Sequence, residues 1–133
     1  MRLPFNVGGP VQRNFDFLAG QSKVAFPFAA GFTNVGGALE DATYSKHGRT
    51  VSLQGLVTKT VGTITVGDVL GTLPDGARPT GTLLFPVQIS TSTAGASNVG
   101  RLDVLANGDV TFNAGTVSGG DFLSFSGILF VAA

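Results

Sequence analysis

Apolar and polar residues alternate in three stretches of the chain: HGRTVSLQGLV (47–57), VGRLDVLANGDVTF (99–112) and LSFSGILFVAA (123–133). A period of two is typical of β-strands that bury one face and expose the other. Each stretch also contains a glycine, a residue that readily makes tight turns. The pattern therefore predicts an all-β domain of short strands joined by turns.

The alternating runs and the turn residues between them predict about eight strands. One or two short strands are expected near residues 24–33 and 42–46. The others lie near residues 49–58, 61–66, 68–72, 82–91, 99–105, 109–114 and 123–133. Such a series favours an antiparallel β-sandwich of jelly-roll or related topology.

Turn signals between the runs make more local predictions. LPDGARP (73–79) is a cluster of turn residues. Asn107-Gly108 predicts a hairpin with a two-residue turn of the primed type. Pro86 lies inside a predicted strand, which indicates an edge position or a bulge.

The last predicted strand is apolar without interruption from Ile128 to Ala133. Continuous apolarity indicates burial on both faces. We therefore expect the end of this strand to be buried, either inside the sandwich or at a subunit interface.

The first 23 residues differ from the rest and predict one short helix over residues 10–19. Its apolar positions recur at helical spacing, with a proline before them and a glycine after them: Val11, Phe15 and Leu18, between Pro10 and Gly20. A helix this short must dock on something, whether its own domain, a neighbouring protein or a symmetry axis. The chain thus divides into an attachment segment, 1–23, and a domain, 24–133.

Composition favours self-association. Charged residues make up 12% of the chain, eight of each sign, and hydrophobic residues 43%. An average soluble domain has about 25% charged residues, so we expect apolar surface to be buried between subunits. No basic patch is present, which argues against nucleic acid as a partner.

Other classes are disfavoured in the same way. No apolar run approaches the roughly 20 residues of a membrane-spanning helix, so membrane insertion is not expected. The first ten residues are too broken by proline and glycine to be a signal peptide. Cysteine is absent, which excludes disulfides and thiolate metal sites.

His47 is the one histidine, and any Ser-His-Asp chemistry would depend on it. The sequence has no nucleophile elbow, phosphate-binding loop or dinucleotide fingerprint, so we expect no catalytic residue and no cofactor. In a trimer, three copies of His47 could meet on the axis and bind a divalent metal ion. Glu40 and Asp41 could add oxygen ligands, although the spacing does not require such a site.

Two carboxylate pairs, Glu40–Asp41 and Asp103–Asp109, leave a small glycan hydrolase open. We favour solvated turn residues instead, because Asp and Glu are seldom buried.

Three arginines, Arg49, Arg78 and Arg101, lie at or beside predicted strands or turns. They either recognise a carboxylate or phosphate of a ligand or form ion pairs. We favour ion pairs, for which arginine is the usual choice. The candidate partners are Asp41, Asp75 and Asp103.

The order of the motifs also resembles a known family. YSKHGRTVSLQGLV (44–57) is followed by TLPDGARP (72–79), LLFPV (83–87), RLDVLANGDV (101–110) and LSFSGILF (123–130). This series resembles the small knob domains of tail fibres and related virion proteins of tailed bacteriophages. NVGGPVQRNFDFLA (6–19) is similar to the short segment that precedes or attaches such domains.

The resemblance implies a homotrimeric β-sandwich knob on the outside of a phage particle, in a virion assembled in the host cytoplasm. It implies attachment to other virion proteins through Val11, Phe15 and Leu18, and contact with a host-surface glycan through loops 90–98 and 115–121. Residues 21–43 leave no room for the shaft of a long fibre, which favours a short tip or spike.

Three alternatives remain at this point: a capsid decoration or head-spike protein without a receptor role, a small glycan hydrolase, and a non-phage lectin. The family shares no catalytic residues, so the resemblance implies none for this chain.

Overall fold

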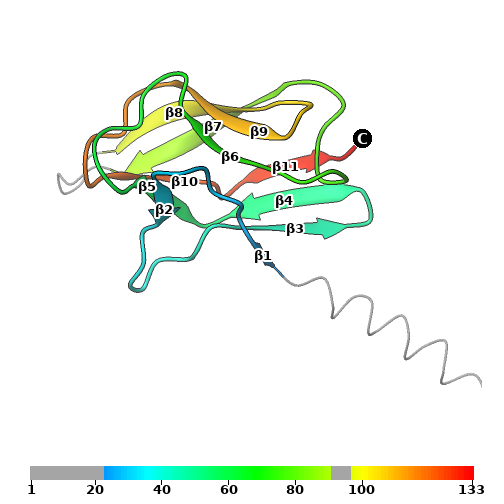
Figure 1. The fold of residues 1–133 in the computed structure, drawn as a ribbon, viewed down its shortest axis with the longest axis horizontal. Coiled ribbons are helices and arrows are strands. Elements are labelled where there is room, and N and C mark those ends of the chain that lie inside the picture. Colours follow the sequence, from blue (N-terminus) through cyan, green and yellow to red (C-terminus); the bar gives the residue numbers. More distant parts are fainter. Residues whose placement is uncertain (1–22, 91–96) are drawn as a thin grey trace, which may run out of the picture.

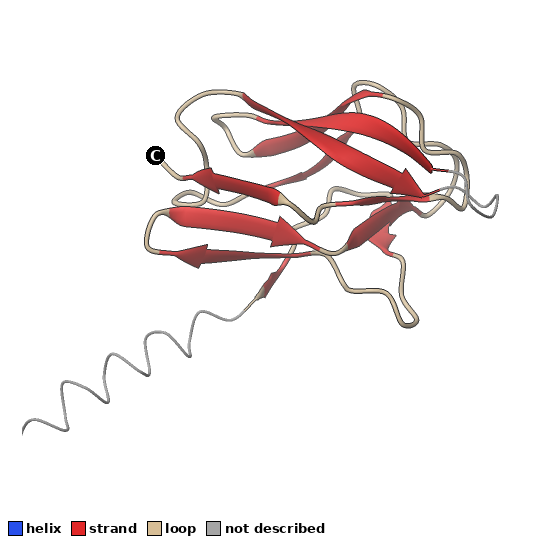
Figure 2. Ribbon diagram, turned by 180° about the vertical axis from the view of Figure 1, so that it is seen from behind, coloured by secondary structure: helices blue, strands red, loops and turns tan. Residues whose placement is uncertain are grey.

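Two antiparallel β-sheets face one another across an apolar core in the computed structural model, which describes residues 23–90 and 97–133 (Figures 1 and 2). The predicted all-β class and antiparallel sandwich are confirmed. The helix predicted over residues 10–19 lies outside the described residues. Within them, no helix is long and apolar enough to cross a membrane.

The smaller sheet has four strands, in the order β1 (Val24–Ala25), β3 (Thr43–His47), β4 (Thr50–Gln54) and β11 (Ile128–Val131). The larger sheet has the order β2 (Phe32–Asn34), β5 (Leu56–Lys59), β10 (Phe122–Ser124), β7 (Leu83–Ser90), β8 (Ser97–Val104), β9 (Asp109–Ala114) and β6 (Val69–Thr72). Every strand pair is antiparallel, and β7, β8 and β9 form a meander of neighbours.

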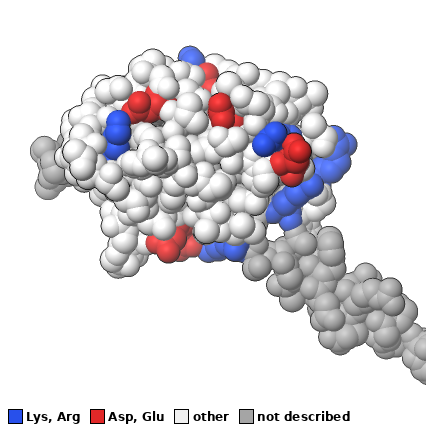
Figure 3. Space-filling view, viewed as in Figure 1, with Lys and Arg blue, Asp and Glu red and all other residues white. Residues whose placement is uncertain are grey.

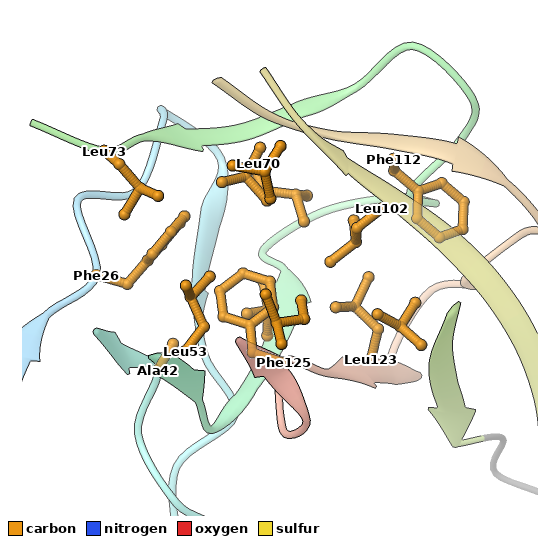
Figure 4. Packing of buried hydrophobic residues seen from close by; sticks show 14 of the residues in the cluster. Phe26, Ala42, Leu53, Leu70, Leu73, Leu102, Phe112, Leu123 and Phe125 are labelled. Atoms are coloured by element: carbon orange, nitrogen blue, oxygen red, sulfur yellow. The ribbon is translucent and has the colours of Figure 1, made fainter. Parts of the chain in front are cut away.

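The core is built from the alternate residues of facing strands. Leu53 of β4, Leu102 of β8 and Phe112 of β9 point into the space between the sheets (Figure 4). The rings of Phe26 and Phe125 meet edge to face, with their centroids 4.8 Å apart. Burying such a side chain contributes about 1.5–3 kcal/mol, so these residues account for much of the stability.

The strand predicted over residues 49–58 divides into two at Gly55. This glycine has a φ of +104°, and a Cβ on it would collide with the carbonyl of Asp41. The backbone bends there and passes from β4 in the smaller sheet to β5 in the larger one. A glycine at such a sheet corner is required by both conformation and space.

The strand predicted over residues 123–133 divides in the same way, so the prediction of one continuous strand is wrong. β10 pairs with β5 and β11 pairs with β4. The N–H of Phe125 donates to the carbonyl of Gly55 at 2.8 Å, so the two bends lie side by side.

Burial on both faces of the last strand is also wrong for the single chain. Ile128 and Phe130 are buried, but Leu129 is 59% exposed and Val131 is 58% exposed. The reason is that β11 forms the edge of the smaller sheet and keeps the alternation of a half-buried strand.

The hairpin predicted at Asn107-Gly108 is confirmed, but its turn type is not. The N–H of Leu105 donates to the carbonyl of Asp109, and the N–H of Gly108 donates to the carbonyl of Leu105. Gly108 has a φ of +95°, whereas no non-glycine residue in the described part has a positive φ. Both primed turns need a positive φ at the first of their two central residues, which here would be Asn107. The loop is therefore the three-residue form, residues 106–108.

Pro86 occupies a locally unpaired edge, as predicted. Along β7 it faces Arg101 of β8 on one side. On the other side, β10 reaches only Ile89 and Ser90. The proline therefore interrupts no ladder on that side.

Candidate functional site

Two long loops meet at one end of the domain, and we call residues 60–68 and 115–121 together the loop end (Figure 1, at the left). Ile64 and Val117 exchange two backbone hydrogen bonds, of 2.8 and 3.1 Å. Both side chains are buried. The two loops therefore share part of the core and form one surface.

Lys59 and Asp68 shape the first loop. The Nζ of Lys59 lies 3.3 Å from Asp68 Oδ2, and the N–H of Thr65 donates to the same oxygen at 3.0 Å. These contacts close residues 60–67 into a loop, so the strand predicted over 61–66 is wrong. Ile64 alone keeps a bridge, to Val117.

Asp121 holds the second loop. Its carbonyl accepts a hydrogen bond from Thr58 Oγ1 at 2.8 Å, and its N–H donates to the carbonyl of Ser118 at 2.9 Å. The predicted outward loop over 115–121 is confirmed, since Thr116 and residues 118–120 are exposed. Of the other predicted loop, 90–98, residues 91–96 lie outside the described residues.

The loop end exposes hydroxyls, backbone groups and methyl groups. Its carboxylates are either paired, as Asp68 is with Lys59, or buried, as Asp121 is. The exposed side chains belong to Thr60, Val61, Thr65, Val66, Thr116 and Ser118. Such a surface can donate and accept hydrogen bonds, but it carries little charge with which to select an anion.

A polar cluster lies on the outer face of the larger sheet. Arg101 donates from Nε to Asp103 Oδ1 at 2.8 Å and from Nη2 to Oδ2 at 3.2 Å, and Asn113 Nδ2 donates to Oδ2 at 2.6 Å. Asp103 is only 7% exposed, although Leu102 and Val104 beside it fill the core. The favoured ion pair of Arg101 and Asp103 is thus confirmed. The contribution of Asn113 was not predicted.

Charged side chains are few on the face shown in Figure 3, and several gather at the end opposite the loop end. The chain ends on that side (Figure 1), and the N–H of Ala133 donates to the carbonyl of Arg78 at 2.8 Å. The Nη1 of Arg78 lies 3.0 Å from Asp75 Oδ1, which confirms that ion pair. Arg49 instead donates from Nε and Nη2 to the carbonyl of Ala132, at 3.2 and 2.9 Å. Both arginines therefore make contacts within the chain.

Three of the four carboxylates considered for glycan cleavage have partners in the described part of the chain. Glu40 forms an ion pair with Lys23, and Asp109 Oδ1 accepts a hydrogen bond from Thr72 Oγ1 at 2.7 Å. Asp103 is held by Arg101, as described above. These contacts account for Glu40, Asp103 and Asp109 as structural groups. The expectation of a solvated turn residue is wrong for Asp103, which lies in β8 and is buried, because Arg101 and Asn113 replace its water.

His47 lies at the end of β3. In the part of the chain that the structure describes, no group of three or more His, Asp or Glu residues could hold a metal ion, so His47, Glu40 and Asp41 form no such group in one copy. A metal ion on a trimer axis remains a prediction. The proposed attachment residues Val11, Phe15 and Leu18 lie outside the described residues.

An open groove of about 440 Å³ runs beside β11 on the smaller sheet. Its lining comes from β4 and β11 and from the bend between β10 and β11: Ser52, Leu53, Gln54, Ser126, Gly127, Ile128 and Leu129. The hydroxyls of Ser52 and Ser45 share a hydrogen bond of 3.0 Å. The lining carries no formal charge, so the groove suits a neutral group. No feature of the sequence pattern predicted it.

Comparisons with known proteins place the fold. No protein family matches the sequence, and no curated protein does. The structure is similar to the receptor-binding protein gp15 of Listeria phage PSA, with a TM-score of 0.64 and 20% identity over 96% of this chain and 74% of that one. It is also similar to the head domain of phage bIL170, with a TM-score of 0.57 and 11% identity over 84% of this chain and 98% of that one. That head domain is described in connection with the receptor-binding domains of lactococcal phages. At these identities the shared property is the fold.

Proposed function

We propose that this chain is a host-attachment domain carried on the outside of a bacteriophage particle. The observation that supports the proposal most is the fold, which the chain shares over nearly its whole length with a phage receptor-binding protein. The series of sequence motifs points to phage knob domains independently of the fold. The domain acts by binding and performs no catalysis.

The loop end is the proposed contact surface, and its ligand is a neutral, hydroxyl-rich glycan. Thr116 and Ser118 supply hydroxyls, and the exposed glycines beside them leave backbone groups accessible. Val61 and Val66 supply methyl groups that can pack on the C–H faces of a sugar ring. Because Ile64 and Val117 already join the loops, binding costs little additional ordering.

Binding through this surface is weak for a single copy. The chain has no Trp, and no aromatic residue falls within residues 60–68 or 115–121, so large stacking contacts are absent from the proposed surface. Several copies on one particle would raise the overall affinity by multivalency. We propose a homotrimer for this reason, joined to other virion proteins through residues 1–23 and assembled in the host cytoplasm.

Binding to bacterial surfaces tests the proposal. The labelled full-length chain is incubated with purified cell walls from a panel of bacteria that includes Listeria and Lactococcus, and saturable binding to at least one wall is expected. Ser118→Arg should abolish it, because a long cationic side chain then covers the loop end. Thr80→Arg, at an exposed position outside the loop end, should bind as the unaltered chain does.

The place of the protein in the particle provides a second test. Gold-labelled antibodies should mark the tail tip of intact phage, at a copy number far below that of the major capsid protein. Labelling of the whole head at a comparable copy number would indicate capsid decoration, and the attachment proposal would then be abandoned.

A further inference from the structure

The outer face of the smaller sheet presents regular rows of side chains across β3, β4 and β11. On these strands Tyr44, Val51, Leu53, Ile128 and Phe130 contact the core, so the residues between them point outward. The strand register places His47 beside Thr50 and Val131 in one row, Ser45 beside Ser52 and Leu129 in the next, and Thr43 beside Gln54 in a third. We call these eight residues the β3–β4–β11 face.

None of the eight residues of the β3–β4–β11 face is Asp, Glu, Lys or Arg. The ion pair of Glu40 with Lys23 borders the face at Gln54, whose Nε2 donates to Glu40 Oε2 at 3.4 Å. In lacking these four residue types, the face differs from the outer face of the larger sheet, which holds the Arg101–Asp103 pair. Its edge strand, β11, is bonded to β4 alone, and its residues ILFV include none of the charges or prolines that usually protect an edge. Leu129 and Val131 are more than half exposed there.

We infer that copies of this chain associate with one another through the β3–β4–β11 face. Around a rotation axis, identical residues of different copies approach each other, so a charged residue near the axis would meet its own copy. This face avoids that repulsion over three strands. The low share of charged residues and the positive mean hydropathy of the chain favour the same burial.

The face also combines a recess with a projection. The groove reaches from Gln54 to Leu129, and Val131 projects two residues further along β11. An interface that inserts Leu129 and Val131 of one copy beside the groove of the next is heterologous, and it gives a closed trimer when successive copies are related by a third of a turn. The occupant is therefore another copy of the same chain. This inference does not depend on the proposed glycan ligand.

Sedimentation velocity of the full-length chain over a range of concentrations tests the inference. The unaltered chain should sediment as an oligomer, with the mass of a trimer as the expected value. Leu129→Glu should weaken association on the order of a hundredfold or more, because it places like charges together in a desolvated interface. Val61→Glu is the matched control, since Val61 is 82% exposed at the loop end, and it should leave the oligomer intact.

A second pair of variants keeps the test decisive if one of them folds poorly. Val131→Lys introduces the opposite charge on the same face and should also yield monomers, with Val66→Lys at the loop end as its control. Circular dichroism verifies that each variant retains its strands. A monomeric unaltered chain, or oligomers that persist in both Leu129→Glu and Val131→Lys, would overturn the inference.

Spin labels locate the interface directly, because the chain has no native cysteine. A label on Thr50→Cys should give shorter distances between copies than a label on Thr116→Cys at the loop end. Equal distances, or the reverse order, would contradict an interface on the β3–β4–β11 face. A chain that assembles only when other virion proteins are added would assign the face to one of those proteins instead.

Discussion

Asp103 is a carboxylate with little exposure on the outer side of a sheet. Three hydrogen bonds from Arg101 and Asn113 take the place of its water. Arg101 comes from the same strand and Asn113 from the neighbouring one, so the cluster ties β8 to β9 through side chains as well as through the ladder. A buried charge of this kind stabilises the fold only while its partners remain.

Replacing Asp103 tests this cluster. Asp103→Ala leaves the donors of Arg101 and Asn113 without their acceptor, so the free energy of unfolding should fall by about 2–3 kcal/mol. Asp75→Ala is the control, because Asp75 is also paired with an arginine but its side chain is 97% exposed. It should change stability by at most about 0.5 kcal/mol. Urea denaturation measures the free energy of unfolding of both variants. Equal losses in the two would contradict the view that burial makes the contacts of Asp103 important for stability.

At the level of residues, the sequence predicted pairs that are close along the chain. Arg101 and Asp103 are two apart on a strand and therefore share a face, and Arg78 lies three residues from Asp75 in one turn. Asn113 could not be predicted, because its place depends on a register shift between Arg101 and Leu102.

At the level of elements, alternation predicted the strands but not the sheets to which they belong. The strand over 109–114 was predicted with its observed bounds, and those over 82–91 and 99–105 to within two residues. Both runs that span a bend were predicted as single strands. The apolar periodicity continues through Gly55 unchanged, because both sheets bury their residues in the same core.

The bend at Gly55 can be tested by adding a methyl group. Gly55→Ala combines a positive φ with a collision against the backbone of Asp41, so the free energy of unfolding should fall by about 3 kcal/mol or more. Gly127→Ala is the matched control in the neighbouring bend. It has a φ of +94° but nothing within 4 Å, so it should cost only about 1–2 kcal/mol. Guanidinium denaturation of both variants measures the difference, and a larger loss at Gly127 would contradict this explanation.

At the level of the whole molecule, the two ends of the sandwich differ in chemistry. The loop end exposes hydroxyls and methyl groups, whereas the opposite end carries Arg49, Arg78 and Asp75. The sequence predicted one of the two loops that form the loop end. It could not predict that the segment 60–68 joins the other, because the contact between Ile64 and Val117 links positions far apart in the chain.

The division of the chain at residue 23 predicts that residues 24–133 fold on their own. Removing residues 1–23 breaks the ion pair of Lys23 with Glu40, whose side chains are both about half exposed. A boundary at residue 23 makes the loss of this exposed pair the expected cost, so the free energy of unfolding should change by at most about 0.5 kcal/mol in urea. The shortened chain should bind cell walls but should no longer be incorporated into phage particles. A shortened chain that fails to fold would refute the boundary.

The pairing of β4 and β5 with β11 and β10 has a consequence for how the protein is made. On the ribosome, β4 and β5 emerge before β6 to β9 and can pair at once with β3 and β2, but their other neighbours, β11 and β10, emerge only after all of these. Val51, Leu53 and Val57, which are buried in the finished domain, lack part of their cover for that period. Sheets dominated by such distant pairings fold slowly and expose apolar surface while they wait. The nascent chain is thus most vulnerable to proteases, and most dependent on chaperones, just before its last two strands are synthesised.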